Sequence, residues 1–417
     1  MAKKKNYAFD TIVVHGNKST GHDHGATLPP IFQNAAFTHK SAESLSRTFS
    51  GATDEPIYTR LGNPTNHALE KRLTELEGGK GAIAMASGMA AIANTCMALL
   101  RTGDEFVAGR SLFMSTYVLF TSVFKKYGIT ARLAAPLDSS GIKAAINDRT
   151  RFVYLETIGN PAMDVPDIRH ISKTAHDYGI PLIVDNTLAT PFLCRPLELG
   201  ADVVIHSTTK YLGGHGASVG GAVIVGDSFE WDKKRFPDFE PFVQRKGSLA
   251  LIDKIWREHH INFGTTQSPM DAYLTLLGIN TLSLRMERHF ANAIKVANFL
   301  KGHPKVKWVN YPGLENSPSH ATAVKQFGKK GFGALLTFGL ADQDTCFRFI
   351  DNLKLILNIA NLGDCRTMAI HPYSTQYVSF DEATRRNLSI TPDMIRLSVG
   401  IENPSDICDD IAHALEE

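Results

Sequence analysis

Cysteine is scarce in this sequence, and its placement excludes two kinds of structural site. The five cysteines are scattered along 417 residues and never form a CxxC pair. A disulfide framework and a structural zinc site both depend on paired or regularly spaced cysteines. The sequence therefore predicts a protein of a reducing compartment. Because no apolar segment of signal-peptide length follows the basic start, we expect that compartment to be the cytoplasm.

A surplus of charge of either sign is also absent. The chain has 44 basic and 42 acidic residues, which leaves a formal net charge of +2 at pH 7. Proteins that bind nucleic acid or an anionic membrane surface usually carry a concentrated basic excess. We therefore expect neither a nucleic acid nor a membrane as a partner, and a small molecule as the substrate.

Uninterrupted hydrophobic runs of membrane-spanning length are missing as well. The most apolar stretch, residues 81–100, contains Ser87, Gly88, Asn94 and Thr95. A membrane-spanning helix is built from predominantly apolar residues over its whole length, and these polar residues disfavour one. The sequence predicts a buried core helix over this stretch instead.

The residues that are present suffice for a large core, because 43% of the chain is hydrophobic. Helical patterns alternate with short β-branched runs from about residue 65 to residue 225. Four such runs are residues 151–157, 180–186, 202–207 and 221–226. This alternation predicts an α/β fold with a mostly parallel sheet and helices on both faces. Ligands of such sheets bind beyond the carboxyl ends of the strands.

The pattern along the chain predicts three parts. Residues 1–64 are rich in glycine, proline, histidine and threonine, which is typical of an extended arm that contacts a neighbouring subunit. Residues 65–266 hold the alternating pattern of the large domain. Residues 267–417 begin with a long helical region over 268–300 and predict a smaller C-terminal α+β domain.

Three features of the large domain together point to one cofactor. Asp185 ends an apolar strand pattern, Lys210 follows the next one beside several hydroxyl groups, and a small-residue turn at 86–91 opens a helix. Pyridoxal phosphate needs a lysine amine for its aldehyde and a carboxylate for its ring nitrogen. Its phosphate needs hydroxyls and the free N–H groups of a helix start. Ser87 to Met89, with Ser207 and Thr209, are the residues that we expect at the phosphate.

With these motifs the sequence resembles the Cys/Met-metabolism family of fold-type I pyridoxal-phosphate enzymes, over nearly the whole chain. The matching motifs are YTRLGNPT (58–65), ASGMAA (86–91), ETIGNP (156–161), VDNT (184–187), HSTTKYLGGHG (206–216), LRMERH (284–289), NLGD (361–364), HPYS (371–374) and IRLSVGIEN (395–403). The resemblance implies the fold of that family and a homotetramer built from two catalytic dimers.

The resemblance also implies a role for each site residue. Lys210 forms the Schiff base, Asp185 pairs with the pyridine nitrogen, and Asn160 lies near the ring hydroxyl. The implied phosphate ligands are Ser87, Gly88, Met89, Ser207 and Thr209, with Tyr58 and Arg60 reaching the phosphate from the neighbouring subunit. Arg396 binds the substrate α-carboxylate, a role that also suits the planar fork of a guanidinium group. Asn361 contributes to substrate binding.

One residue departs from the family pattern. Phe113 stands where the family usually has a tyrosine stacked on the cofactor ring. Phenylalanine can stack in this catalytic position, but it cannot exchange a proton. Tyr117 lies four residues later, and in a helical segment it would point a turn away from the ring.

Phe113 and Asn361 together favour one branch of the family. The segment around Asn361 looks like the O-acetylhomoserine sulfhydrylase branch, and a carboxylate leaving group needs less protonation than a thiolate. The expected activity is therefore γ-replacement on O-acetyl-L-homoserine with sulfide or methanethiol. The alternatives are methionine γ-lyase and another trans-sulfuration activity, such as O-succinylhomoserine sulfhydrylase or cystathionine γ-synthase.

Two further patterns suggest other classes of site. Residues 216–220 fit GxSxG, but a hydrolase nucleophile needs a strand before the serine, and here a glycine-rich loop precedes it. His22, Asp23 and His24, like residues 258–260, are dense in metal-ligand types without a metal-binding spacing. We predict neither a serine hydrolase nor a metal site.

Overall fold

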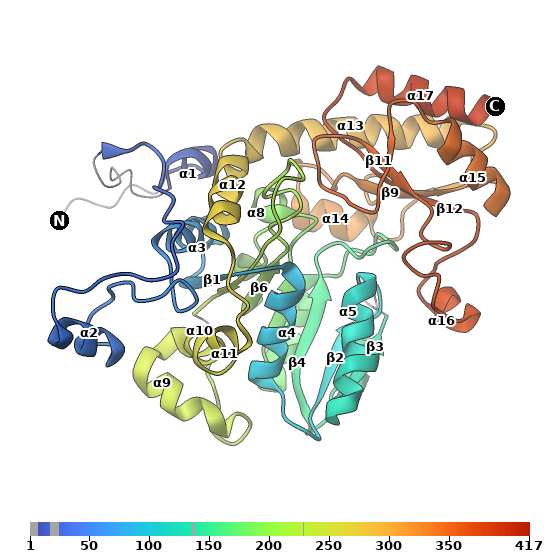
Figure 1. Cartoon of the computed structure of the whole chain (residues 1–417). Helices are drawn as coiled ribbons and strands as arrows, with labels where there is room; N and C mark the ends of the chain where they lie inside the picture. The colour runs from blue at the N-terminus through green and yellow to red at the C-terminus, as the bar shows by residue number, and fades with distance from the viewer. Residues whose placement is uncertain (1–6, 17–24, 136, 138, 228) are drawn as a thin grey trace. The chain divides into compact units, whose positions relative to one another are not determined.

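The computed structural model of the chain describes residues 7–16, 25–135, 137, 139–227 and 229–417 (Figure 1). The predicted N-terminal arm is therefore described only in part, and His22 to His24 lie outside the described residues. Within the described residues, no helix combines the length and the apolar character that crossing a membrane requires.

A seven-stranded sheet holds the apolar runs of the first half of the chain. Its strands are β1 Gly81–Met85, β2 Glu105–Gly109, β3 Thr130–Ala134, β4 Thr150–Glu156, β5 Leu182–Asp185, β6 Val203–His206 and β7 Gly221–Val225. The strand order is β1-β7-β6-β5-β4-β2-β3. β2 pairs in parallel with β3 and β4, and β4 with β5, whereas β1 pairs antiparallel with β7. Every residue of β2, β6 and β7 is buried, which explains why these runs are apolar except for Glu105 at the start of β2 and His206 at the end of β6.

The apolar stretch 81–100 is not one buried helix, so that prediction was wrong for residues 81–85, whereas the helix start predicted at 86–91 is confirmed. Residues 81–85 form β1, and α4 Gly88–Leu99 begins three residues later. The break lies at Ala86 and Ser87, and α4 begins at Gly88; serine and glycine disfavour a helix interior but suit a helix start. The strand register places Met85 of β1 opposite Gly221 of β7.

A second, smaller sheet has five strands in the order β10-β11-β12-β9-β8. These are β8 Trp308–Asn310, β9 Leu335–Gly339, β10 Leu357–Asn358, β11 Met368–Ile370 and β12 Met394–Ser398. β12 pairs antiparallel with β11 and with β9, so it is an interior strand of this sheet. All five residues of β12 are buried.

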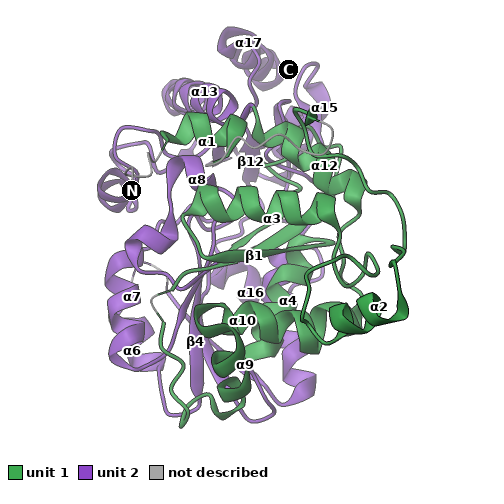
Figure 2. Ribbon diagram, turned by 90° about the vertical axis from the view of Figure 1, so that its left-hand side faces the viewer, with its two compact units in different colours: residues 1–99, 205–280 green, residues 100–204, 281–417 purple. Residues whose placement is uncertain are grey.

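The chain divides into two compact units (Figure 2). Unit 1 consists of residues 1–99 and 205–280, and unit 2 of residues 100–204 and 281–417. The boundary at 204/205 falls inside β6. The three-part organisation with boundaries after residues 64 and 266 stays a prediction.

The helices of unit 1 are α1 Phe9–His15, α2 Ala42–Phe49, α3 Pro64–Glu77, α4 Gly88–Leu99, α9 Glu240–Lys246, α10 Ala250–Lys254, α11 Ile261–Phe263 and α12 Pro269–Ile279, with helical turns η5 Pro237–Phe239, η6 Gly247–Leu249 and η7 Ile255–His260. α3 has a well-defined start and end. The Asn63 side chain accepts the N–H of Thr65 at 2.9 Å, and Gly78 ends the helix at φ 73°. Such caps follow from the sequence NPT…EGG.

The helices of unit 2 are α5 Met114–Val118, α6 Ser139–Ala145, α7 Ile168–Asp177, α8 Thr190–Leu193, α13 Leu282–Gly302, α14 His320–Phe327, α15 Gln343–Asn352, α16 Glu382–Asn387 and α17 Pro404–Glu416, with turns η2 Leu119–Val123, η3 Phe124–Tyr127 and η4 Pro196–Leu199. The helical region predicted over 268–300 is two helices, α12 and α13. The break comes at Thr281, whose φ of −110° and ψ of 11° leave the helical range.

Candidate active site

In unit 1, Lys210 lies in the loop that joins β6 to β7. Hydrogen bonds within the loop fix its backbone: the N–H of Lys210 donates to the carbonyl of Ser207 at 3.3 Å, and the N–H of Gly214 donates to the carbonyl of Lys210 at 2.7 Å. The Thr209 hydroxyl donates to the Gly220 carbonyl at 3.2 Å and accepts the Gly220 N–H at 3.0 Å. The lysine therefore projects from a tightly bonded turn.

The start of α4 packs against this loop. A Cβ atom on Gly88 would lie 2.7 Å from Cβ of Ser207, and one on Gly221 would lie 2.2 Å from the carbonyl oxygen of Ser87. Both glycines are thus required by close backbone approach. The Ser87 hydroxyl accepts the N–H of Ala90 at 3.1 Å and keeps its own proton available for donation. This combination of a helix start and hydroxyls suits a phosphate.

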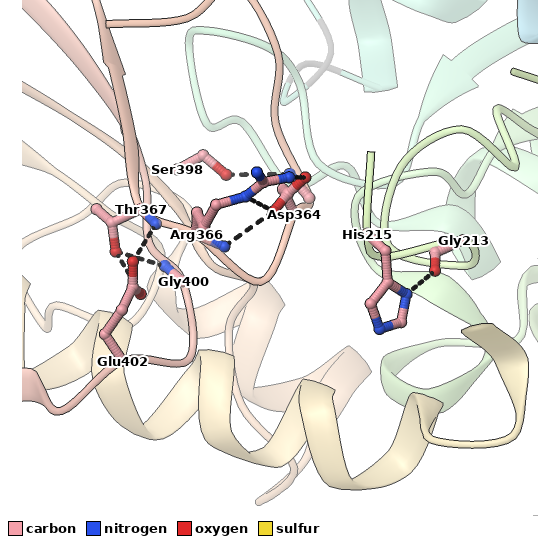
Figure 3. A network of polar contacts seen from close by, with 9 residues as sticks. Gly213, His215, Asp364, Arg366, Thr367, Ser398, Gly400 and Glu402 are labelled. Atoms are coloured by element: carbon pink, nitrogen blue, oxygen red, sulfur yellow. Dashed lines mark hydrogen bonds and ion pairs between the residues drawn. The ribbon is translucent and has the colours of Figure 1, made fainter. Parts of the chain in front are cut away.

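A buried acid and base pair supports the strand that leads to Lys210. Nε2 of His206, the last residue of β6, lies 2.6 Å from Oε1 of Glu77, the last residue of α3. Both side chains are fully buried. Sequence reasoning gave neither residue a role, because 129 positions separate them. In the same loop region, Nδ1 of His215 lies 2.7 Å from the Gly213 carbonyl oxygen (Figure 3).

Tyr58 and Arg60 lie at the surface of unit 1. The Tyr58 side chain is 42% exposed, and the Arg60 guanidinium lies 5.5 Å from the centre of its ring. Arg60 Nη1 also donates to the carbonyl of Ile261 at 2.6 Å. Both residues line an open hollow of about 470 Å³ together with Gly264 and residues 266–269. Their exposure leaves them available to a ligand outside their own unit.

In unit 2, Asp185 ends β5 at the carboxyl edge of the sheet. Its Oδ1 accepts the N–H of Thr187 at 3.0 Å, and its Oδ2 accepts the hydroxyl of Tyr154 at 3.3 Å. These bonds fix the carboxylate in one orientation. Glu156 lies opposite Asp185 in the β4–β5 register.

Glu156 is a site residue that sequence reasoning missed. Burial, together with the negative charge of Asp185, raises its pKa well above the ordinary value for a glutamate. Its Oε1 accepts the backbone N–H of Phe113 at 2.6 Å. The only signal in the sequence was its place in the motif ETIGNP, which does not reveal a contact 43 residues away.

Phe113 precedes α5 and is half-buried. Met114 and Tyr117 of α5 pack against a cluster of buried residues around Tyr377. The ring of Tyr117 lies 5.4 Å from that of Phe380, and burial raises the pKa of its hydroxyl, which contacts Thr384. Tyr117 thus faces Phe380 and α16.

Arg396 on β12 brings three of the expected residues together. Its Nη1 donates to Oδ1 of Asn160 at 3.2 Å and to Oε1 of Gln376 at 3.0 Å, and its Nη2 donates to the carbonyl of Asn361 at 3.2 Å. Arg396 is only 2% exposed. Asn361 thus contacts Arg396 through its backbone, and Gln376 is a partner that sequence reasoning did not identify.

A polar network holds the loop that carries Asn361 (Figure 3). Arg366 donates from Nε and Nη2 to the two carboxylate oxygens of Asp364, each at 2.8 Å. The hydroxyl of Ser398 accepts the N–H of Gly363 at 3.1 Å, which ties the loop to β12. Glu402 accepts the N–H and the hydroxyl of Thr367 at 2.6 and 2.8 Å. The loop therefore has a fixed conformation next to Arg396.

The GxSxG segment at 216–220 and residues 258–260 have structural surroundings that differ from those of a hydrolase or metal site. Ser218 is followed by β7 and lies in the β6–β7 loop, and its hydroxyl lies 3.5 Å from that of Thr275. A nucleophile elbow has the opposite order of strand and helix. Glu258, His259 and His260 lie in η7, where burial lowers the pKa of His260 to about 4. Its Nδ1 lies 3.1 Å from the Thr265 hydroxyl, so His260 has a structural partner.

Known proteins resemble this chain over its whole length. Residues 10–416 match the family described as Cys/Met metabolism PLP-dependent enzyme. An O-acetyl-L-homoserine sulfhydrylase of Leptospira meyeri is 40% identical over 99% of this chain and 97% of its own. A homocysteine synthase of Schizosaccharomyces pombe is 38% identical over 98% of each chain.

Solved structures agree with these matches. A putative O-acetylhomoserine (thiol)-lyase of Campylobacter jejuni, crystallised with N'-pyridoxyl-lysine-5'-monophosphate, superposes with a TM-score of 0.93 and 33% identity over 99% of this chain and 100% of that chain. A cystathionine γ-lyase of Lactobacillus plantarum gives 0.86 and 32% over 98% and 99%. The predicted fold class is thereby confirmed.

Proposed function

We propose that this chain, which belongs to the Cys/Met metabolism PLP-dependent enzyme family, catalyses γ-replacement on O-acetyl-L-homoserine. Sulfide replaces the acetoxy group at Cγ, which gives homocysteine and acetate; methanethiol in place of sulfide gives methionine. The observation that carries this proposal is the 40% identity to an O-acetyl-L-homoserine sulfhydrylase over almost the full length of both chains.

The residues present fit pyridoxal phosphate in both units. Unit 1 offers the amine of Lys210, and the close packing of Gly88 on Ser207 leaves the start of α4 beside the hydroxyls of the lysine loop. Unit 2 offers the Asp185 carboxylate, which is already oriented by Tyr154 and Thr187. We assign the phosphate to Ser87, Gly88, Met89, Ser207 and Thr209, and the pyridine nitrogen to Asp185.

Each residue then has a defined task in the reaction. The bound cofactor stores the electron pair that remains when the substrate loses its Cα proton. Lys210 removes that proton and transfers protons to and from Cβ, so that acetate can leave from Cγ. Arg396 binds the substrate α-carboxylate in a bidentate manner, steadied by Asn160 and the carbonyl of Asn361.

Phe113 stacks on the ring and takes no part in proton transfer. An acetate leaving group tolerates this, because a carboxylate departs with little help from an acid, whereas a thiolate benefits from one. The phenylalanine thus supports ester substrates over thioethers such as methionine and cystathionine.

The active enzyme is proposed to be a homotetramer in the cytoplasm. Tyr58 and Arg60, which are exposed on unit 1, would bind the phosphate held by a neighbouring subunit. A site shared in this way makes dimerisation a condition for activity.

A substrate panel on the cofactor-loaded protein tests the proposal. O-acetylhomoserine and O-succinylhomoserine are supplied with sulfide, and methionine and cystathionine without it, and both thiol and keto acid are measured. We expect homocysteine and acetate in equal amounts from O-acetylhomoserine. Keto acid formed from methionine would identify the protein as a γ-lyase. Homocysteine formed only from O-succinylhomoserine would show that the acyl group of the substrate is succinyl and not acetyl.

A further inference from the structure

The segment that carries Phe113 is attached to residues 156–164 at three points. The Phe113 N–H donates to Glu156 at 2.6 Å, and the Ser111 hydroxyl donates to Oδ2 of Asp164. In addition, a Cβ atom on Gly159 would lie 2.7 Å from Cβ of Ser111, so the two backbones are in close contact. The position of the Phe113 ring is therefore set by its backbone attachments.

Glu156 is shared between this segment and the carboxylate-binding arginine. Besides accepting the N–H of Phe113, its carboxyl group interacts with the backbone N–H of Asn160, whose side chain accepts from Arg396 at 3.2 Å. One buried carboxyl group thus contacts the backbone of the ring-stacking residue and that of an Arg396 partner.

We infer that Glu156 is a positioning residue, which fixes Phe113 against the cofactor ring and Asn160 against Arg396 by accepting their backbone N–H groups. This inference rests on the role proposed for Phe113. The Phe113 ring has no polar atom for side-chain hydrogen bonds, so its orientation depends on the backbone.

The burial of Glu156 determines whether its carboxyl group is neutral or charged when it accepts these hydrogen bonds. Only 8% of the residue is exposed, and Asp185 lies opposite it in the strand register. Desolvation and the neighbouring negative charge both favour a neutral carboxyl group. A neutral acid still accepts hydrogen bonds through its carbonyl oxygen, so a glutamine of the same shape can replace it at the Phe113 contact.

The test compares Glu156→Gln with Glu156→Met, which keeps the approximate volume but has no acceptor oxygen. The first readout is the circular dichroism of the cofactor band divided by its absorbance, because this ratio follows the orientation of the bound ring and needs no substrate. The second is kcat/KM for O-acetylhomoserine. Glu105→Gln and Glu105→Met are the matched controls, because Glu105 is 2% exposed in the same unit. Its side chain bonds Arg132 and Asn147, which are remote from Phe113 in the sequence.

We expect E156Q to keep the dichroism ratio, and E156M to lose most of it with a fall of about 10- to 100-fold in kcat/KM, as for other displaced catalytic groups. Both Glu105 variants should keep the ratio even if they unfold at lower temperature. An unchanged ratio in E156M, or an equal loss in E156Q and E156M, overturns the inference.

A second variant covers the case in which E156M does not fold. Ser111→Ala removes the hydrogen bond to Asp164, which also attaches the Phe113 segment to residues 156–164. We expect this variant to lose part of the ratio of dichroism to absorbance. An unchanged ratio in S111A together with a lost ratio in E156Q would also contradict the inference. Because the dichroism requires bound cofactor alone, it separates this result from a failure of the proposed substrate.

Discussion

Arg396 owes its orientation to neutral oxygen atoms. Asn160 and Gln376 contribute side-chain amide oxygens, and Asn361 contributes a backbone carbonyl. None of these three partners neutralises the guanidinium charge. These bonds orient the guanidinium fork, whose planar geometry matches a carboxylate such as that of an α-amino acid.

The charge on Asp185 is predicted to matter for catalysis more than for folding. Asp185→Asn keeps the shape and removes the negative charge that we propose holds the ring nitrogen protonated, so we expect kcat to fall about 100- to 1000-fold, as for other preorganised electrostatic groups. Acetate release and cofactor absorbance are the measurements.

Asp202→Asn is the control for this substitution. Asp202 is buried, whereas Asp185 is half-buried, and Asp202 accepts the N–H of Leu182 at 2.8 Å at the other end of β5. We expect D202N to lower thermal stability and to leave kcat of the folded protein intact. A D185N enzyme that retained wild-type kcat with bound cofactor would contradict the role of Asp185.

The sequence could identify the charged residues of the site but not their supporting partners. Lys210, Asp185 and Arg396 stand out because a charge at the end of an apolar strand pattern needs an explanation. The contacts of Glu156 with Phe113 and of Gln376 with Arg396 connect segments 43 and 20 residues apart. Such contacts depend on how loops fold, which local patterns do not specify.

At the scale of elements, the start of α4 depends on a glycine. Gly88→Ala would place a methyl group 2.7 Å from Cβ of Ser207 and 3.0 Å from its Cα, so the helix or the lysine loop must shift. We expect weaker retention of the cofactor during dialysis and a loss of about 1–3 kcal/mol in unfolding free energy from overpacking.

Gly302→Ala is the control for this prediction. A Cβ atom on Gly302 at the end of α13 would meet nothing within 4 Å. We expect G302A to retain the cofactor like the wild type and to change stability only slightly. If G88A and G302A behaved alike in both measurements, the close packing of α4 on Ser207 would not matter for cofactor binding.

The sequence predicted the types of most elements near the site better than their ends. The β-branched runs that end at Asp185 and His206 are strands β5 and β6, as their composition indicates. The stretch 81–100 was taken for one helix because small apolar residues suit both helix and strand. Only the pairing of β1 with β7 determines that its first five residues are extended.

At the scale of the whole molecule, each compact unit is assembled from two separate segments of the chain. Sequence composition changes gradually along the chain, so it cannot reveal that residues 1–99 associate with residues 205–280. The predicted arm, large domain and C-terminal domain follow chain order and remain predictions for this reason.

The shared site is tested by mixing two inactive chains. Arg60→Ala removes the proposed phosphate ligand of the neighbouring subunit, and Lys210→Ala removes the proposed catalytic amine. In a mixed dimer, one site receives both wild-type residues, so we expect part of the activity to return after subunit exchange. Differently tagged chains show whether exchange took place, and each variant refolded alone should stay inactive.

No recovery with exchange demonstrated would place Arg60 in the site of its own chain or outside any site. It would leave the assignments of Lys210 and Asp185 unaffected, because neither depends on a neighbouring subunit.

The buried pair of Glu77 and His206 gives α3 a mechanical role. This helix starts at Pro64, four residues after Arg60, and its 14 residues end at Glu77, which contacts His206 four residues before Lys210. At a rise of 1.5 Å per residue, the helix is about 21 Å long. A displacement of segment 58–63 would therefore be transmitted through α3 to β6, so that the proposed contact with a neighbouring subunit and the conformation of the lysine loop are physically connected within one chain.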